Sequence, residues 1–515
     1  MANTVALTVL GFAGSLQILT YQADNEPGYQ ETSNLVGAVN TSVRSGNLVV
    51  ALPGSATTIP AGSAGLLQVG VGGQYAIAPG YSTLIDTAST AATVFGGSTD
   101  GQLVIAGSGG LAFNAGLGSG TVLAGDASNY ISVLRGAGAQ KIATGIGDDT
   151  IVALNGNNII TAGAGNNFVL AQAGSNFIES FGEDLIWCPD GNATITLYDP
   201  QEPGSNPIQA RTVFLGSGAS QVVDAAARLR GLQTSTPNRS VIVVGSTAAT
   251  IKSEGADQIW MQGGGGLVQS TGVHLEIGFG DVPQPTSIVT VTGYSADTII
   301  GGTGAITVNA IQANDFVFAG PGALQFTGGL GASTILGNAT GIASITGGAG
   351  SVIAIAYGQT SFTGGAGAAT IAAFGGSVTI NGGAGSGLFI AATTGNNRIT
   401  AGTGNTTIYG GGAGDVLAAG SLGGGILVAG NGAETLIGEA GADLFAVVQG
   451  KIGDLVVQNF TKGQDAINLS GFAGNEAAIA LAASSIIAGS QQVNLSDGTR
   501  ILFVGVSGLS ASSFI

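Results

Sequence analysis

Short apolar segments alternate with glycine-rich turns along most of the chain. Between residues 136 and 180 the alternation has a period of nine residues, as in GIGDDTIVA (145–153) and GAGNNFVLA (163–171). Each nonapeptide places a glycine third and a β-branched residue seventh, as Gly147 and Ile151 show. Glycine permits the positive φ of a tight turn, and a β-branched residue favours a strand. The period therefore predicts short strands joined by tight turns.

A second array follows the same plan with less regular turns. Its Gly-Gly pairs begin at Gly328, Gly347, Gly364 and Gly382, and an apolar segment follows each pair. Two nonapeptides make one coil of about 18 residues, and coils stack through parallel ladders about 4.8 Å apart. We predict an all-β fold, a parallel β-solenoid with an irregular N-terminal β cap and a C-terminal closing hairpin.

The strength of the pattern changes along the chain and suggests five regions. An N-terminal cap is expected because the end of a solenoid exposes an unpaired strand edge. One helix is expected at Val222–Leu232 and another at Glu476–Ala488. The regions are an irregular β region (1–100), the nonapeptide solenoid (101–180), an irregular β insertion or distorted stretch of solenoid (181–292), the glycine-rich solenoid (293–446) and a closing element (447–515).

Charge is scarce and acidic. Only 8% of the residues are charged, and the net charge is −17. An acidic balance disfavours nucleic acid and anionic membrane surfaces, and it suits cations. No charged residue occurs between Gly320 and Thr394. A surface with so little charge resists self-association weakly, which predicts an oligomer or polymer. The alternative is a monomer kept soluble by small polar residues.

Two features bear on where the protein works. Cys188 is the single cysteine, so no intramolecular disulfide forms, and no apolar run is long enough for a membrane-spanning helix. The start, Met1 to Leu10, is apolar but has no basic segment before it, which is a poor secretory signal. Export is therefore expected to depend on another part of the chain.

The repeats resemble the repeats-in-toxin (RTX) family, whose signature is G-G-x-G-x-D-x-U-x, with U a large apolar residue. The closest matches are GIGDDTIVA and GEAGADLFA (438–446). The resemblance implies calcium sites between successive turns, with the residue at the sixth position as a ligand. That position holds Asp149, Glu434 and Asp443 in the acidic repeats, Asn158, Asn167 and Asn176 in others, and Ser333, Ala369 and Gly387 in the middle array.

These differences predict where calcium binds. Calcium takes six to eight oxygen ligands, several of them anionic, so the middle array should not bind it. The asparagines have two readings, a ladder of stacked amides with Asn158 over Asn176, or calcium ligands. Asp149 and Asp443 are either ligands or solvated turn residues.

The C-terminal region carries the stronger resemblance. The segment DLVVQNFTKGQDAINLSGF, from Asp454, is similar to the element that closes the RTX β-roll, although Asn459 and Asn468 replace two of its acids. The last stretch is similar to the terminal hairpin and export signal of that family. The resemblance implies a type I exporter as partner and a secreted, extracellular or cell-surface location. The predicted calcium ligands are Asp148, Asp149, Glu434, Asp443, Asp454 and Asp465.

We predict that the protein is not an enzyme. The single histidine, His274, lies in a predicted strand, so the zinc-protease motif of some RTX proteins cannot form. Carboxylate pairs of the glycosidase type remain formally open at Glu183–Asp184 and at Glu254 with Asp257. Cys188 has no histidine near it in the sequence.

Two functions remain. The first is an extracellular structural protein that self-assembles into a surface layer, filament or matrix scaffold. The second is an adhesin or glycan-binding module, with a cell-surface polysaccharide as partner. Exposed aromatic residues on a flat β face would favour the second, but Trp187 and Trp260 are ambiguous between core and surface.

Overall fold

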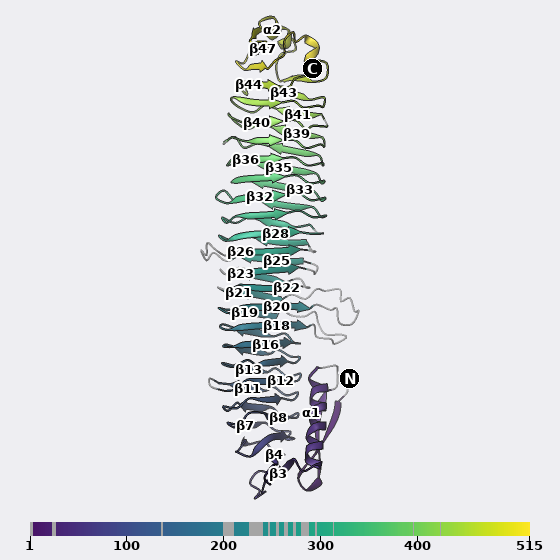
Figure 1. Cartoon of the computed structure of the whole chain (residues 1–515), viewed down its shortest axis with the longest axis vertical. Helices are drawn as coiled ribbons and strands as arrows, with labels where there is room; N and C mark the ends of the chain where they lie inside the picture. The colour runs from purple at the N-terminus through teal and green to yellow at the C-terminus, as the bar shows by residue number, and fades with distance from the viewer. Residues whose placement is uncertain are drawn as a thin grey trace. The chain divides into compact units, whose positions relative to one another are not determined.

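Nearly all of the regular structure in this computed structural model is short β-strand (Figure 1). The chain divides into two compact units, Met1–Gly266 (unit 1) and Leu267–Ile515 (unit 2), and we describe each by itself. The structure describes residues 4–22, 27–134, 137–198, 211–225, 240–245, 248–253, 257–261, 266–270, 274–279, 288–293, 296–312, 314–394, 396–422 and 424–515.

Unit 1 stacks its solenoid strands into two parallel sheets, which we call 1A and 1B. Sheet 1A contains β3 (Leu48–Ala51), β4 (Ala64–Val69), β6 (Tyr81–Asp86), β8 (Gln102–Ala106), β10 (Gly120–Leu123), β12 (Gln140–Ala143), β14 (Ile159–Ala162), β16 (Ser175–Ser180), β18 (Asn192–Tyr198), β20 (Ser220–Ala225) and β22 (Ala249–Ser253). Sheet 1B contains β5 (Gln74–Ala76), β7 (Ala92–Phe95), β9 (Leu111–Asn114), β11 (Tyr130–Val133), β13 (Thr150–Ala153), β15 (Phe168–Ala171), β17 (Leu185–Cys188), β19 (Arg211–Leu215), β21 (Ser240–Val244) and β23 (Gln258–Met261).

The strand register confirms the predicted coil of two nonapeptides. Ile142 pairs with Ile160 and Ile160 with Ile178, while Ile151 pairs with Val169 in the other sheet. All five side chains are fully buried between the sheets. The column of β-branched residues seen in the sequence is therefore the core of the coils, and burial of each such side chain stabilises the stack by roughly 1.5–3 kcal/mol.

Close stacking of the turns explains the columns of glycine. A Cβ atom at Gly163 would lie only 1.8 Å from the carbonyl oxygen of Gly145, one coil below. Gly165 has a φ of 107°, which residues with a side chain rarely adopt. Some turn glycines are thus required by φ and others by contact with the next coil.

The N-terminal region differs from the predicted irregular β cap. Strands β1 (Thr4–Leu10) and β2 (Leu16–Gln22) form an antiparallel hairpin, with η1 (Phe12–Gly14) at its turn, and α1 (Pro27–Arg44) follows. The solenoid begins at β3, so residues 48–100 already belong to it.

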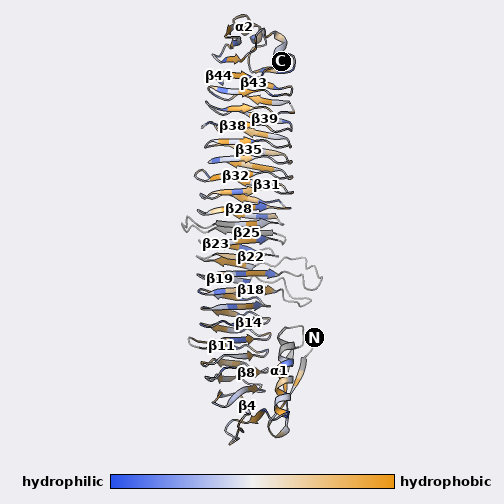
Figure 2. Cartoon of the chain, viewed as in Figure 1, coloured by the Kyte–Doolittle hydropathy of each residue, from blue (hydrophilic) through white to orange (hydrophobic). Residues whose placement is uncertain are grey.

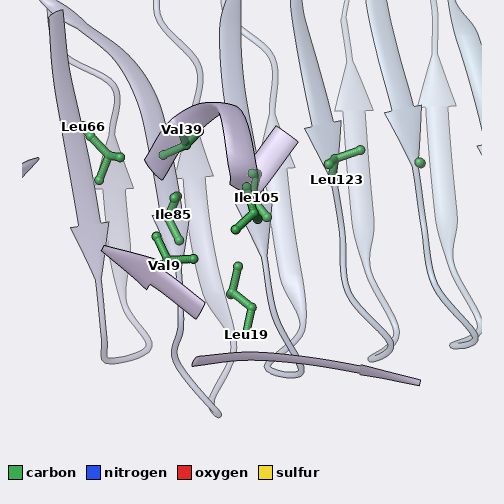
Figure 3. Close-up of a cluster of buried hydrophobic side chains, with 9 residues drawn as sticks. Val9, Leu19, Val39, Leu66, Ile85, Ile105 and Leu123 are labelled. Carbon is green, nitrogen blue, oxygen red and sulfur yellow. The ribbon is translucent and has the colours of Figure 1, made fainter. Parts of the chain in front are cut away.

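The hairpin and α1 cover sheet 1A at its first coils. Val9, Leu19 and Val39 pack against Ile85 and Ile105 in one buried cluster (Figure 3). The side chain of Asn40 joins helix and hairpin, accepting a hydrogen bond from Leu10 N (2.8 Å) and donating one to Thr8 O (2.7 Å). The cap therefore shields an apolar outer face of the first coils.

Solenoid pairing continues through the described strands of residues 181–261. Strands β17, β19, β21 and β23 pair in parallel, as do β16, β18, β20 and β22. The helix expected at Val222–Leu232 is wrong at its start, because β20 extends to Ala225 and buries Val222 and Asp224. The rest of that expected helix lies outside the described residues.

Unit 2 has the same two-sheet plan. Its first sheet, 2A, contains β26 (Ile288–Gly293), β28 (Ala305–Ala310), β30 (Leu324–Thr327), β32 (Ile342–Thr346), β34 (Gln359–Thr363), β36 (Val378–Asn381), β38 (Arg398–Thr400), β40 (Val416–Ala418), β42 (Glu434–Ile437) and β44 (Asp454–Gln458). Its second sheet, 2B, contains β25 (His274–Phe279), β27 (Ala296–Ile300), β29 (Phe316–Phe318), β31 (Ser333–Leu336), β33 (Val352–Ala356), β35 (Ala369–Ala373), β37 (Gly387–Ile390), β39 (Thr406–Tyr409), β41 (Gly425–Val428), β43 (Leu444–Val448) and β45 (Ala466–Ser470). Strand β24 (Gly266–Ser270) lies at the boundary between the units.

The C-terminal element closes unit 2 as predicted, with a hairpin. Strand β47 (Ser490–Asn494) pairs antiparallel with β46 (Ser485–Ile487) and with β48 (Arg500–Phe503), and β48 extends sheet 2A beside β44. The preceding helix, α2 (Glu476–Ala482), is shorter than expected, because β46 forms within its predicted range. A short helical turn, η2 (Ala511–Ser513), follows β48. Of the helices in the described residues, none is long and apolar enough to cross a membrane.

Candidate calcium sites

The residue at the sixth position of the RTX signature, which is the fifth residue of units written as GIGDDTIVA and GAGNNFVLA, lies just before, or at the start of, a strand and points into the turn. Stacking of the coils brings these residues into columns, one for each sheet. The 1B column contains Asn129, Asp149, Asn167, Asp184, Arg211, Ser240 and Asp257. The 2A column includes Val378, Asn397, Asp415 and Glu434, and the 2B column includes Gly425, Asp443 and Asp465.

Acid and amide side chains in the 1B column form a hydrogen-bonded ladder. Asp149 Oδ1 accepts bonds from Asn129 N (2.7 Å) and Asn129 Nδ2 (2.9 Å), one coil below. Asn167 Oδ1 in turn accepts a bond from Asp149 N (2.8 Å), and Asp184 Oδ1 accepts bonds from Asn167 N and Nδ2. Each carboxylate thus holds the backbone of the neighbouring turn.

Asp149 and Asp184 each have one carboxylate oxygen that could accept a further hydrogen bond or bind a cation. Both side chains are buried, and Oδ2 of each has no hydrogen bond of normal geometry. Desolvation raises the pKa of each carboxyl to about 6, opposed in part by the Thr144 hydroxyl for Asp149 and by the Ser180 hydroxyl for Asp184. A bound cation would pair with the idle oxygen and favour the ionised form. The alternative of a solvated turn residue is wrong for Asp149.

The 2A column places two carboxylates in adjacent coils. Asp415 accepts four hydrogen bonds, two from Asn397 (N, 2.9 Å; Nδ2, 2.8 Å) and two from the amides of Gly411 and Gly412. Glu434 Oε2 accepts one from Gly430 N (2.8 Å), while its Oε1 is buried without a partner. Desolvation, assisted by the charge of Asp415, raises the pKa of Glu434 to about 7. A cation between the turns would offset the repulsion between these two stacked acids and favour their ionised forms.

The 2B column brings Asp443 and Asp465 together. Asp443 accepts bonds from Gly425 N and Glu439 N, both at 2.8 Å. Asp465 accepts bonds from Asp443 N (2.9 Å) and Thr461 N (2.8 Å), and burial raises its pKa. Asp443 is buried, so it too is not a solvated turn residue.

The other two predicted ligands lie outside the columns. Asp148 is exposed on the outside of its turn, where it accepts a bond from Asn166 N (2.7 Å). Asp454 is one residue out of register, because Leu455 pairs with Glu434. It therefore faces outward and forms an exposed ion pair with Arg500 (Nε to Oδ1, 2.5 Å). Neither joins another of the predicted acids.

Sequence reasoning missed several acids of the same columns, and spacing would have found one of them. Asp415 follows Asn397 by 18 residues and ends a Gly-rich turn, GGGAGD (410–415). Desolvation also raises the pKa of Asp315, to about 7. The acids missed as ligands are Asp184, Asp257, Asp297, Asp315 and Asp415.

Asparagines without a neighbouring acid behave as an amide ladder. Asn158 N and Nδ2 both donate to Asn176 Oδ1 (3.2 and 3.0 Å), in the column of sheet 1A. In the middle array the 2B column holds Ser333, Ala369 and Gly387. These turns contain no carboxylate and stack through backbone bonds such as Ala369 N to Ser386 O (2.9 Å).

The acidic turns offer calcium single carboxylates rather than clusters of acids. Among the described residues, no three acidic, histidine or cysteine side chains come close enough to share a metal ion. Each acidic turn offers one buried carboxylate, together with amide and backbone carbonyl oxygens, which calcium accepts readily. Asp149, Asp184 and Glu434 fit best, because each has a buried oxygen without a partner.

Two of the carboxylates suggested for glycoside hydrolysis are part of the same ladders. Asp184 and Asp257 are buried and accept bonds from Asn167 N and Ser240 N, respectively. Glu254 lies outside the described residues. Cys188 is buried, and desolvation raises its pKa to about 12, which disfavours a thiolate nucleophile. His274 lies in a strand, as predicted.

Comparison with known families identifies the repeats. The family described as RTX calcium-binding nonapeptide repeat (4 copies) matches residues 144–178, 391–422 and 428–446. These segments contain Asp149, Asp415, Glu434 and Asp443. No curated protein matches the chain.

Proposed function

We propose that this chain, an RTX-type repeat protein with calcium-binding nonapeptide repeats, is secreted and self-assembles outside the cell into a layer, filament or matrix. The fold is typical of non-catalytic, structural proteins, and RTX repeat proteins are typically secreted. One observation carries the assembly proposal: from β29 to β41, sheet 2B presents a mainly apolar outer face without charged residues.

That face consists of two outward columns. The first includes Phe318, Ile390 and Tyr409, and the second includes Ile353 and Leu388. These side chains are 37 to 48% exposed. In the second column Thr334, Thr370 and Thr407 alternate with the apolar residues, and neither column holds a charge over these coils. A mainly apolar surface without charge favours association.

The outer face of sheet 2A over the same coils is quite different. It presents exposed hydroxyl and amide side chains, among them Ser344, Thr346, Ser361, Thr363 and Asn381. Figure 2 shows the hydropathy of the strands of unit 2. The two faces together favour one-sided packing through 2B, while 2A stays in water.

Charge added to each face tests assembly. The full chain in millimolar calcium is expected to form ordered particles by light scattering and electron microscopy. The variant Ile353→Lys/Leu388→Lys is expected to stay monomeric, because a lysine buried in a contact is costly. Thr346→Lys/Thr363→Lys, with the same net charge, is the control and should assemble. A wild-type monomer at all concentrations would instead favour the adhesin alternative.

Export is the second part of the proposal. The closing hairpin and the terminal residues correspond to the region that resembles the RTX export signal, and a type I exporter is the proposed partner. Deletion of about the last 60 residues is expected to leave the protein in the cytoplasm of the producing cell. Immunoblots of medium and cell fractions measure this, and a truncated protein in the medium would contradict it.

A further inference from the structure

Both tryptophans of the chain lie on the outer face of sheet 1B, in one column. Leu170 pairs with Trp187, Trp187 with Phe214, Phe214 with Val243 and Val243 with Trp260. One side chain comes from each of the consecutive sheet 1B strands β15, β17, β19, β21 and β23, some of which are labelled in Figure 1. We name these five residues the aromatic stripe.

The rings of the stripe are open to solvent. Trp187 is 47% exposed, Phe214 40% and Trp260 45%. The residues that precede these rings in the strands, Ile186, Val213 and Ile259, point to the inner face of the sheet and are fully buried. The sequence left the tryptophans ambiguous between core and surface, and the alternation of each strand places them outside. Rings held half-exposed by a rigid sheet form a ready-made contact surface.

The dimensions of the stripe suit a narrow, extended ligand. Four coil intervals of about 4.8 Å give a stripe roughly 19 Å long and one side chain wide. Such a strip offers far less than the roughly 800 Å² per partner that a stable protein interface buries. Contact with a second copy through the stripe alone is therefore disfavoured.

The sheet surface on one side of the stripe is uncharged, and the turn after β17 on the other side carries the exposed acid Asp190. Next to it runs a column with Leu185, Thr212, Val241 and Gln258, which contains no charged residue. A neutral face on a chain of net charge −17 disfavours anionic ligands. It suits a ligand with apolar ring faces and hydroxyl edges.

We propose that the aromatic stripe binds an uncharged, extended polysaccharide, with successive pyranose rings lying on successive coils. The apolar face of a pyranose stacks on an aromatic ring, and one pyranose in an extended chain is about as long as the coil rise of about 4.8 Å. The rings of Trp187, Phe214 and Trp260 supply the stacking. The site is independent of the assembly face on sheet 2B.

Intrinsic fluorescence tests the site directly, because the only two tryptophans of the chain are in the stripe. Titration of the full chain in calcium with cellohexaose or chitohexaose is expected to give a saturable blue shift. The variant Phe214→Thr keeps both tryptophan reporters and introduces a β-branched residue that suits a strand. Its affinity should fall about five- to tenfold. Trp187→Thr/Trp260→Thr should lose retention on regenerated cellulose.

Phe177→Thr is the matched control. Phe177 is an exposed ring (38%) on β16 of the opposite sheet, so the variant should bind as the wild type does. No shift with either oligosaccharide would overturn the proposal, and so would equal losses in Phe214→Thr and Phe177→Thr. A shift that depends on protein concentration alone, and disappears in Phe214→Thr, would assign the stripe to a second copy instead.

Discussion

Chelation of calcium is expected to remove hydrogen-exchange protection from the acidic turns and to leave the middle array protected. Asp149, Asp184, Asp415 and Glu434 are buried carboxylates, and as candidate calcium ligands they would lose the charge that compensates them when calcium is removed. A ligand present at 100 times its dissociation constant stabilises its site by about 2.7 kcal/mol, so exchange should rise roughly 100-fold there. Strands β30 to β37 have no carboxylate in their turns and should change little.

The one-dimensional nature of a solenoid makes a local response possible, since each coil contacts only its neighbours. Exchange measured by mass spectrometry in calcium and in chelator would locate the response. Loss of protection across residues 320–394 as well would contradict a metal-free middle array. No change at residues 144–190 and 410–470 would contradict the assignment of the ligands.

The pH dependence of the stability of the calcium-free protein tests the buried carboxyls without calcium and so serves as a control for chelation. Burial raises the pKa of Glu434 from 4.5 to about 7 and that of Asp149 from 3.8 to about 6. Groups with a raised pKa contribute stability that is present below pH 4 and lost as pH rises through 6 to 7. In chelator the melting temperature should therefore fall between pH 5 and pH 8, by the equivalent of roughly 3 kcal/mol for Glu434. The variant Glu434→Gln should not show the part of this fall that comes from Glu434. Added calcium should restore the stability of the wild type at pH 8.

The regular arrays were predictable because one period sets both turn and core. Once Ile142 and Ile160 are seen to be 18 residues apart, the parallel register and the inward direction of both follow. The same spacing from Asn397 leads to Asp415. Asp454 shows the limit of motif matching, because a shift of one residue turns a side chain to the other face of the sheet.

Unequal coil lengths hide the register elsewhere. In the 1B column, Arg211 follows Asp184 by 27 residues and Ser240 follows Arg211 by 29, so a period of 18 cannot be extended through them. The helix α1 is easier to recognise in the sequence than these irregular coils. Leu35, Val36, Val39 and Val43 follow the spacing of one helix face, but short apolar runs on either side favoured strands.

Arg211 takes the place of an acid or amide in the 1B column and is the basis of our second large prediction. Its side chain is 1% exposed. Its Nε donates to Gly182 O (2.8 Å) and its Nη2 donates to Tyr198 O, so the guanidinium holds the backbone of the turns as the amides do elsewhere. Its Nη1 lies 3.9 Å from Asp224 Oδ1, also buried.

Arg211 is also the buried cation among three buried acids. Desolvation raises the pKa of Asp184, and the charge of Arg211 offsets a small part of that rise. Desolvation also raises the pKa of Asp257, and the charge of Asp224 adds to it. Asp224 Oδ2 is held by Ser240 Oγ (2.7 Å). Loss of the guanidinium would leave Asp224 and its neighbours as uncompensated buried charges.

Arg211→Met is therefore expected to lower the free energy of unfolding by about 3–5 kcal/mol, the cost of breaking a buried pair from one side. Arg211→Met/Asp224→Leu should recover most of that loss, because an apolar pair of similar volume needs no counter-charge. Urea unfolding of the full chain in calcium, followed by circular dichroism, measures both.

Arg500→Met is the control, and its contrast with Arg211 is sharp. The pair Arg500–Asp454 is much closer, at 2.5 Å, but its side chains are 60% and 56% exposed. Water already solvates both charges, so the loss should be under about 1 kcal/mol. A loss of under about 1 kcal/mol in Arg211→Met as well would mean that the buried acids take up protons in place of the arginine. A double variant no more stable than Arg211→Met would show that the guanidinium acts through its bonds to Gly182 O and Tyr198 O rather than through its charge.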